Sequence, residues 1–145
     1  GGIKIQNAIG NGFLRLSESK LAKKLKELGH RYPNVRAKYI IEARKHKKDL
    51  KNKDREWIVK NVKGLGYKEA SHFLRNIGNN DYAIIDFHIV DLLVDRGLLE
   101  RPKTMTKRRY LEIENILKEI SKKSEMSLGE LDFYLWYMET GNVLK

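Results

Sequence analysis

Apolar residues recur every three or four positions along almost the whole chain, which is the spacing of one face of an α-helix. Residues that favour helix starts and helix ends separate these apolar segments. The pattern predicts a short helix around Ile58 and further helices that begin at or beside these residues: Ser17, Pro33, Lys68, Phe87, Thr106 and Ser127. No convincing pair of strands is found. The chain is therefore predicted to be all-α.

Three local features refine this picture. In the helix after Pro33, the residues predicted to face inward are Val35, Tyr39, Ile40 and Ala43. Residues 44–55 are nearly all polar, so we expect a loop or a solvated linker there. Residues 83–85 are apolar and are predicted to form a short buried segment that leads to Asp86, at the start of the next helix.

The length of 145 residues predicts a single helical domain over residues 1–145. The chain opens with Gly1 and Gly2 and has no initiator Met, so it is expected to be a fragment or a processed product. No apolar run approaches the roughly 18 residues that a membrane span needs. The absence of cysteine excludes disulfides, thiolate zinc sites and cysteine-ligated iron–sulfur clusters, and four unpaired His residues give no metal-binding spacing.

The charge balance favours a polyanionic partner. Lys and Arg together number 30 against 19 Asp and Glu, which gives a net charge of +11. Such an excess attracts nucleic acid, because binding releases counterions from phosphate. A charged fraction of 34% is also typical of thermophile proteins, so the charge alone leaves both interpretations open.

A glycine-rich turn lies between two short amphipathic helices, at Lys63-Gly64-Leu65-Gly66-Tyr67. Two glycines around one apolar residue favour a narrow hairpin, in which we expect a positive φ at Gly66 and an inward-pointing Leu65. The exposed amides of the turn and of the next helix N-terminus would bind phosphate without reading a base. An ordinary helix–turn–helix connection with a glycine cap is the alternative.

Lys68 and Asp86 form the candidate catalytic pair. Lys68 lies in the first turn of a helix, where the helix dipole disfavours the ammonium form, and only a neutral amine attacks carbon. Asp86 lies at the predicted start of a helix, where the dipole favours a carboxylate. Two titratable groups whose surroundings favour opposite charge states, one neutral and one ionised, are typical of acid–base sites. Taken alone, the residues favour the alternative, a solvated lysine that contacts phosphate and an aspartate that only caps a helix.

Residues 53–90 resemble the helix-hairpin-helix DNA glycosylases, whose motif combines the hairpin, at about residues 53–77 here, with a catalytic Lys and a downstream Asp. The C-terminal stretches, residues 131–137 and 141–145, resemble the type 2 8-oxoguanine DNA glycosylases of archaea and thermophilic bacteria. The resemblance implies that Lys68 attacks the sugar, that Asp86 assists, and that the terminal Lys145 lies in the lesion pocket. It implies the helix-hairpin-helix glycosylase fold, with some N-terminal helices missing before Gly1.

The function implied by this resemblance is excision of 8-oxoguanine from double-stranded DNA, followed by cleavage of the strand. The enzyme is expected to need no cofactor and no metal, and to act as a monomer in the cytoplasm of a prokaryote, at the nucleoid. A glycosylase for another oxidised base and a non-catalytic helix-hairpin-helix DNA-binding module remain alternatives. The latter would need the hairpin but not Lys68 or Asp86.

Several side chains remain open between a functional and a structural role. The expected contacts to the DNA backbone are Lys63, Gly64, Gly66 and Tyr67, although Tyr67 is better explained as packing than as reacting. Trp136 could stack on a flipped base or belong to the core. His72 and His88 are expected to be structural. A solvated face is the favoured interpretation of the basic cluster Lys103, Lys107, Arg108 and Arg109.

Overall fold

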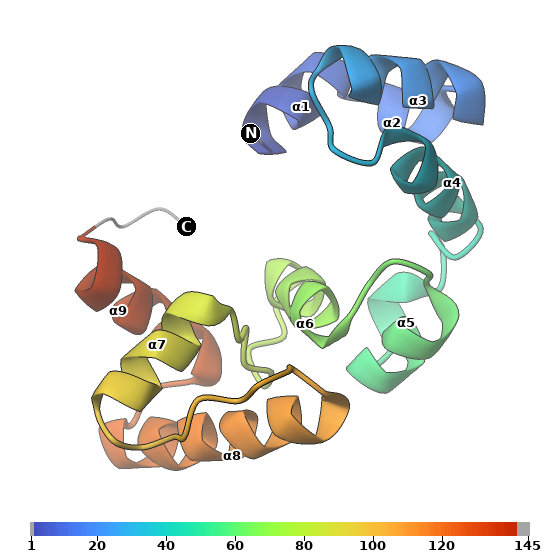
Figure 1. Cartoon of the computed structure of the whole chain (residues 1–145). Helices are drawn as coiled ribbons and strands as arrows, with labels where there is room; N and C mark the ends of the chain where they lie inside the picture. The colour runs from blue at the N-terminus through green and yellow to red at the C-terminus, as the bar shows by residue number, and fades with distance from the viewer. Residues whose placement is uncertain (1, 142–145) are drawn as a thin grey trace. The chain divides into compact units, whose positions relative to one another are not determined.

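The computed structural model describes residues 2–141, and every regular element in this range is helical (Figure 1). This confirms the all-α prediction. The elements are α1 (Gly2–Ile9), α2 (Gly12–Arg15), α3 (Glu18–Glu27), α4 (Pro33–Arg44), the 3-10 turn η1 (Leu50–Asn52), α5 (Arg55–Asn61), α6 (Tyr67–Asn76), α7 (Phe87–Asp95), α8 (Lys107–Ser124) and α9 (Leu128–Thr140).

The chain divides into two compact units, Gly1–Gly64 and Leu65–Lys145. The division falls inside the glycine-rich turn, between α5 and α6. The expectation of one domain over residues 1–145 stays a prediction. No helix of the described residues is both long enough and apolar enough to cross a membrane.

In the first unit, α3 and α4 pack against each other through Leu21, Leu25 and Ala37. The Ser17 hydroxyl accepts a hydrogen bond from the Lys20 amide and so caps α3, as predicted. The prediction that Val35 faces inward is wrong, because its side chain is 50% exposed whereas Ala37 is fully buried. Two residues span about 200° of an α-helix, so the two side chains lie on opposite sides of α4.

The polar segment 44–55 is only partly the solvated linker that was expected. Arg44 is the last residue of α4, and its guanidinium donates hydrogen bonds to the carbonyl oxygens of Phe13 at 2.8 Å and Leu16 at 2.7 Å. Arg55, at the other end, is buried in α5. Composition alone did not predict the role of Arg44, because a guanidinium can bind carbonyl oxygens of another segment while its aliphatic stem packs.

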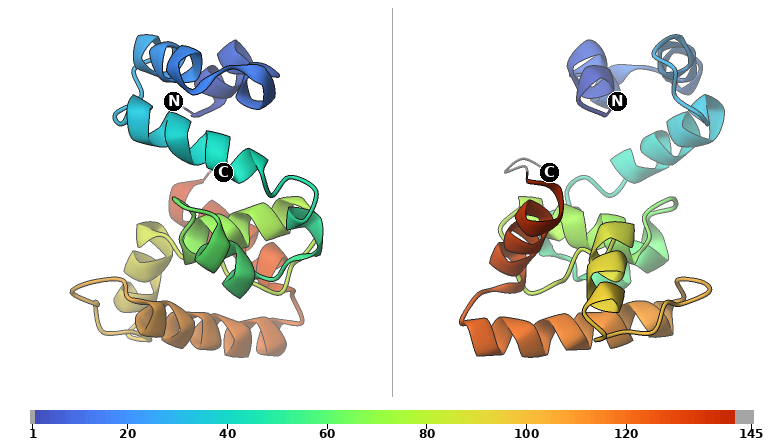
Figure 2. Two further views of the ribbon diagram at one scale, coloured as in Figure 1. Left: turned by 90° about the vertical axis from the view of Figure 1, so that its right-hand side faces the viewer. Right: turned by 60° about the vertical axis from the view of Figure 1, so that its left-hand side comes forward.

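The second unit is built around one apolar core that α7, α8 and α9 share. Its members include Ile89 and Leu93 of α7, Ile113 of α8 and Leu131 of α9. Figure 2 shows that α7 and α9 both lie on the same side of the long helix α8. The segment 83–85 is buried in the same core, as predicted.

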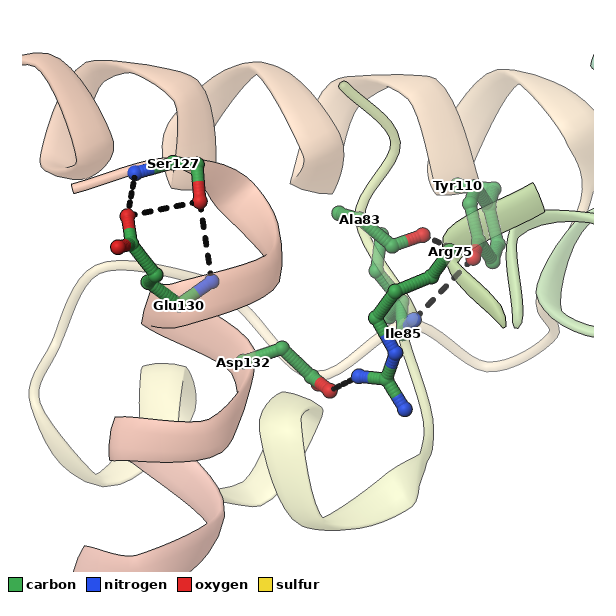
Figure 3. A network of polar contacts seen from close by, with 7 residues as sticks. All are labelled: Arg75, Ala83, Ile85, Tyr110, Ser127, Glu130 and Asp132. Atoms are coloured by element: carbon green, nitrogen blue, oxygen red, sulfur yellow. Dashed lines mark hydrogen bonds and ion pairs between the residues drawn. The ribbon is translucent and has the colours of Figure 1, made fainter. Parts of the chain in front are cut away.

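Helix α9 begins directly after Ser127, as predicted, and a capping box closes its start (Figure 3). The Ser127 hydroxyl accepts from the Glu130 amide, and the Glu130 carboxylate accepts from the Ser127 amide at 2.8 Å. These hydrogen bonds to Ser127 hold the pKa of the Glu130 carboxyl below its usual value. The box and the left-handed Gly141 at the other end explain where α9 starts and stops.

Candidate active site

The two glycines of the turn have different backbone conformations. Gly64 has φ +84°, and a Cβ placed there would lie 2.3 Å from Cδ2 of Tyr39. Gly66 has φ −88° and ψ −173°, an extended conformation, so the prediction of a positive φ at Gly66 is wrong. The reason is that Gly66 is the N-cap of α6, a position where extended backbone is usual. Gly64 is therefore the position in the turn that requires glycine.

The N-terminus of α6 follows directly. The Gly66 amide donates to Oε2 of Glu69 at 3.1 Å, so the Glu69 carboxylate lies beside the N-cap of α6. The helix starts at Tyr67, one residue earlier than predicted, and Lys68 is its second residue. Lys68 thus lies in the first helical turn, as the sequence indicated.

Asp86 caps α7, as predicted. One oxygen of its carboxylate accepts a hydrogen bond from the Ile89 amide at 3.2 Å. The carboxylate is only half-buried. A carboxylate has two oxygens and can accept several hydrogen bonds, so a capping role is compatible with a chemical one.

Lys68 and Asp86 line the same pocket, which has a volume of about 610 Å³. The pocket lies wholly within the second unit. Its lining consists of residues 66–69, 85–87 and 101–107, together with Val90 and Tyr110. The folding of the chain therefore brings a primary amine and a carboxylate, far apart in the sequence, to one cavity.

Tyr67 is half-buried and lines this pocket. Its ring lies 5.6 Å from that of Tyr110, and Nζ of Lys107 lies 5.5 Å from the centre of the Tyr67 ring. This agrees with the interpretation of Tyr67 as a packing residue.

The basic cluster before α8 divides into two kinds of residue. Arg108 and Arg109 both form ion pairs with Glu112 at 2.8 Å, on an exposed face. Hydrogen bonding to Arg108 and Arg109 lowers the pKa of the Glu112 carboxyl, and the same contact raises the pKa of Arg108. Lys103 and Lys107 instead line the pocket. The sequence analysis favoured one solvated face for all four residues. The spacing of four residues between Arg108 and Glu112 favours an ion pair on a helix, and this distinguishes the arginines from the two lysines.

Trp136 lies on α9 and is not among the residues that line this pocket. Its ring contacts that of His88 edge-on at 5.2 Å, and His88 also packs on Phe87 at 4.0 Å. Both Trp136 and His88 are half-buried.

Lys63 is exposed in the turn, and Lys145 lies outside the described residues. Among the residues described, no group of three or more His, Asp or Glu side chains is placed to hold a metal ion.

Comparison with known proteins decides the family. A family model described as 8-oxoguanine DNA glycosylase matches residues 1–126. The whole chain is 57% identical to the 8-oxoguanine DNA glycosylase/AP lyase of Korarchaeum cryptofilum, of which it covers 74%. The protein of the same name from Methanocaldococcus jannaschii is 51% identical, with the same coverage of both chains. The chain belongs to the 8-oxoguanine DNA glycosylase family.

Solved structures of this family have the same fold. The Methanocaldococcus jannaschii enzyme in complex with a 15mer DNA that contains 8-oxoguanine matches with a TM-score of 0.91 and 51% identity, over 99% of this chain and 74% of that one. The Thermotoga maritima 8-oxoguanine DNA glycosylase matches with a TM-score of 0.89 and 47% identity, over 99% and 73%. The helix-hairpin-helix glycosylase fold is thereby confirmed, in a chain that spans about three quarters of its relatives.

Proposed function

We propose that this chain is an 8-oxoguanine DNA glycosylase and AP lyase, with Lys68 as its nucleophile and Asp86 as the assisting carboxylate. The single observation that carries the assignment of residues is their meeting on one pocket. The activity rests on relatives at 51–57% identity that are named 8-oxoguanine DNA glycosylase/AP lyase. The solved structure of a relative in complex with DNA that contains 8-oxoguanine supports damaged DNA as the substrate.

The chemistry requires the damaged nucleotide to leave the helix, because its C1′ is not accessible within a duplex. The neutral Lys68 amine attacks C1′ while the bond from C1′ to the base breaks. Asp86 stabilises the positive charge that develops on the sugar, as carboxylates do in glycoside hydrolysis. Opening of the sugar ring gives a Schiff base between Lys68 and C1′. Loss of a C2′ proton then expels the phosphate from C3′ and nicks the strand.

The turn around Gly64 and Gly66 is proposed to hold the DNA backbone, together with Lys63 and Tyr67. The two glycines are exposed, and the N-cap of α6 is Gly66, which has no side chain of its own. The Glu69 carboxylate accepts from the Gly66 amide. Backbone amides at such a position favour a phosphate oxygen. Contacts of this kind position DNA and carry no sequence information.

Trp136 and Lys145 are proposed to recognise the lesion. 8-Oxoguanine differs from guanine in carrying a hydrogen on N7, and an acceptor for that hydrogen would be left unpaired by guanine. Lys145 is proposed to supply such an acceptor from its backbone carbonyl or to orient the group that does, while Trp136 offers a ring for stacking. Deletion of Lys145 should slow 8-oxoguanine excision much more than it weakens binding to undamaged duplex. Equal effects on both measurements would remove Lys145 from lesion recognition.

A monomer acting on DNA in the cytoplasm is the proposed working form. One chain carries the amine, the carboxylate and the hairpin, so the proposed chemistry needs no second copy. The relatives come from archaea and bacteria, whose DNA lies in the cytoplasm. Size-exclusion chromatography with light scattering, with and without duplex, tests the monomer.

A panel of duplexes tests the function directly. Single-turnover reactions are run on duplexes that differ only at one site, which is 8-oxoguanine, guanine, an oxidised pyrimidine or an abasic site. The proposal predicts base release and nicking at 8-oxoguanine, nicking at the abasic site, and no reaction at guanine. Faster release of the oxidised pyrimidine would change the lesion assigned here. Binding without any reaction would leave only a DNA-binding module.

A further inference from the structure

The hydroxyl of Tyr110, on α8, forms two hydrogen bonds to the segment that precedes Asp86 (Figure 3). It donates to the Ala83 carbonyl oxygen at 2.8 Å and accepts from the Ile85 amide at 3.1 Å. One turn further along α8, the Glu114 carboxylate accepts from the Ala83 amide at 2.9 Å. Tyr110 and Glu114 are only 3% and 2% exposed. Two buried side chains of one helix therefore bind three backbone groups of residues 83–85.

Residues 83–85 have particular need of such partners. They are buried and belong to no helix, so their amides and carbonyls cannot find partners within a regular element. A buried backbone group without a hydrogen bond is costly, so the side chains of α8 fix the path of this segment. The next residue is Asp86. The peptide immediately before the proposed carboxylate is thus held by the Tyr110 hydroxyl.

The ring of Tyr110 contacts the other half of the proposed pair. It lies 5.6 Å from the ring of Tyr67, the residue immediately before Lys68. Tyr110 also lines the pocket that contains Lys68 and Asp86. One side chain therefore contacts the chain neighbours of both proposed catalytic residues, through its hydroxyl on one side and its ring on the other.

We infer that Tyr110 is a positioning residue that sets Asp86 relative to Lys68, through Ile85 and Tyr67. This rests on the proposed roles of Lys68 and Asp86. Nucleophilic attack depends steeply on geometry, since a shift of about 1 Å can cost on the order of 100-fold in rate. The hydroxyl matters for the rate because it fixes the backbone from which Asp86 projects.

Tyr110→Phe tests this, because it removes the hydroxyl and keeps the ring. Single-turnover excision of 8-oxoguanine at saturating protein should slow by roughly 10- to 100-fold. Affinity for undamaged duplex should stay within about twofold, since the proposed backbone contacts lie elsewhere. The matched control is Ser121→Ala, which removes a hydroxyl that donates to a backbone carbonyl near the other end of α8. The control should excise at the wild-type rate.

Measuring the amplitude of the reaction beside its rate constant distinguishes mispositioned catalytic groups from a loss of folded protein. Titration with borohydride on abasic DNA counts the molecules able to form the Schiff base. An unfolding effect lowers this amplitude and leaves the rate constant unchanged, whereas mispositioning lowers the rate constant at full amplitude. A wild-type rate constant for Tyr110→Phe, or a change no larger than that of Ser121→Ala, overturns the inference. If Tyr110→Phe does not fold, Tyr67→Leu decides, because it removes the ring contact with Tyr110 and leaves the Tyr110 hydroxyl in place. Saturating protein removes the effect of the proposed DNA contact of Tyr67 on the measured rate. An unchanged excision rate in that variant overturns the inference equally.

The proposed function fails by a different result. It is lost if wild-type protein does not excise 8-oxoguanine, or if Lys68→Gln still excises it. The inference about Tyr110 is lost when the wild type excises, Lys68→Gln does not, and Tyr110→Phe is as fast as the wild type.

Discussion

At the scale of single residues, Asp86 combines a structural and a chemical role. Its carboxylate accepts the Ile89 amide and also faces the pocket of Lys68. Because Asn is as good an N-cap as Asp, Asp86→Asn separates the two roles. The fold should survive, and single-turnover excision should slow by about 10²- to 10⁴-fold, the usual contribution of one positioned acid–base group.

Asp54→Asn provides the stability control for that experiment. Asp54 caps α5 in the same way, by accepting from the Trp57 amide at 2.8 Å. Both variants should show similarly small shifts of the thermal midpoint. If Asp86→Asn excises within a few-fold of the wild type, the carboxylate is only a helix cap.

Gly64 and Gly66 offer a matched pair for the turn. Gly64→Ala places a Cβ at φ +84° and 2.3 Å from the Tyr39 ring, whereas Gly66→Ala places one at an ordinary φ, 3.1 Å from the end of a flexible Glu69 side chain. The left-handed conformation alone costs about 1–2 kcal/mol. Urea denaturation should therefore show Gly64→Ala clearly less stable than Gly66→Ala. Equal midpoints, or the reverse order, would disprove this account of the turn.

At the scale of elements, α6 and α9 are joined by the buried ion pair of Arg75 and Asp132 (Figure 3), whose side chains are 8% and 5% exposed. Arg75 also lies over the Phe133 ring, 4.6 Å from its centre. Asp132→Asn leaves a buried guanidinium without its counter-charge, which typically costs about 3–5 kcal/mol. The free energy of unfolding in urea should fall accordingly.

Glu112→Gln is the control for that loss, because it breaks ion pairs of the same chemistry on an exposed face of α8. Exposed pairs contribute little to stability, so its unfolding midpoint should barely move. A shift for Asp132→Asn no larger than that of Glu112→Gln would show that the pair does not hold α9 to α6.

The elements also show what a sequence can predict. Helix starts depend on residues next to each other in the chain, so the caps at Ser17, Asp86 and Ser127 could be predicted. The inward face of α4 and the tertiary hydrogen bonds of Arg44 depend on packing partners that the periodicity does not name. For the same reason the sequence could not show that the Tyr110 hydroxyl holds Ala83 and Ile85.

At the scale of the whole molecule, the net charge of +11 predicts DNA binding that weakens steeply with salt. Each phosphate that a protein cation neutralises contributes about −0.9 to the slope of log affinity against log salt. Lys63→Gln should therefore make the slope shallower by about 1, equally for damaged and undamaged duplex. Lys123→Gln, at the C-terminal end of α8, is the control and should leave the slope unchanged. An effect of Lys63→Gln confined to damaged DNA would place Lys63 in the lesion pocket.

The identity of the amine that bonds to DNA is the most direct test of the whole account. Wild-type protein is reacted with an 8-oxoguanine duplex in the presence of borohydride, and the modified residue is located by peptide mass spectrometry. We predict reduced deoxyribose on Lys68, and no covalent complex with Lys68→Gln, although that variant still binds the duplex. Lys103 and Lys107 line the same pocket and are the alternative nucleophiles. An adduct on either of them, or trapping by Lys68→Gln at the wild-type level, would show that Lys68 is not the nucleophile.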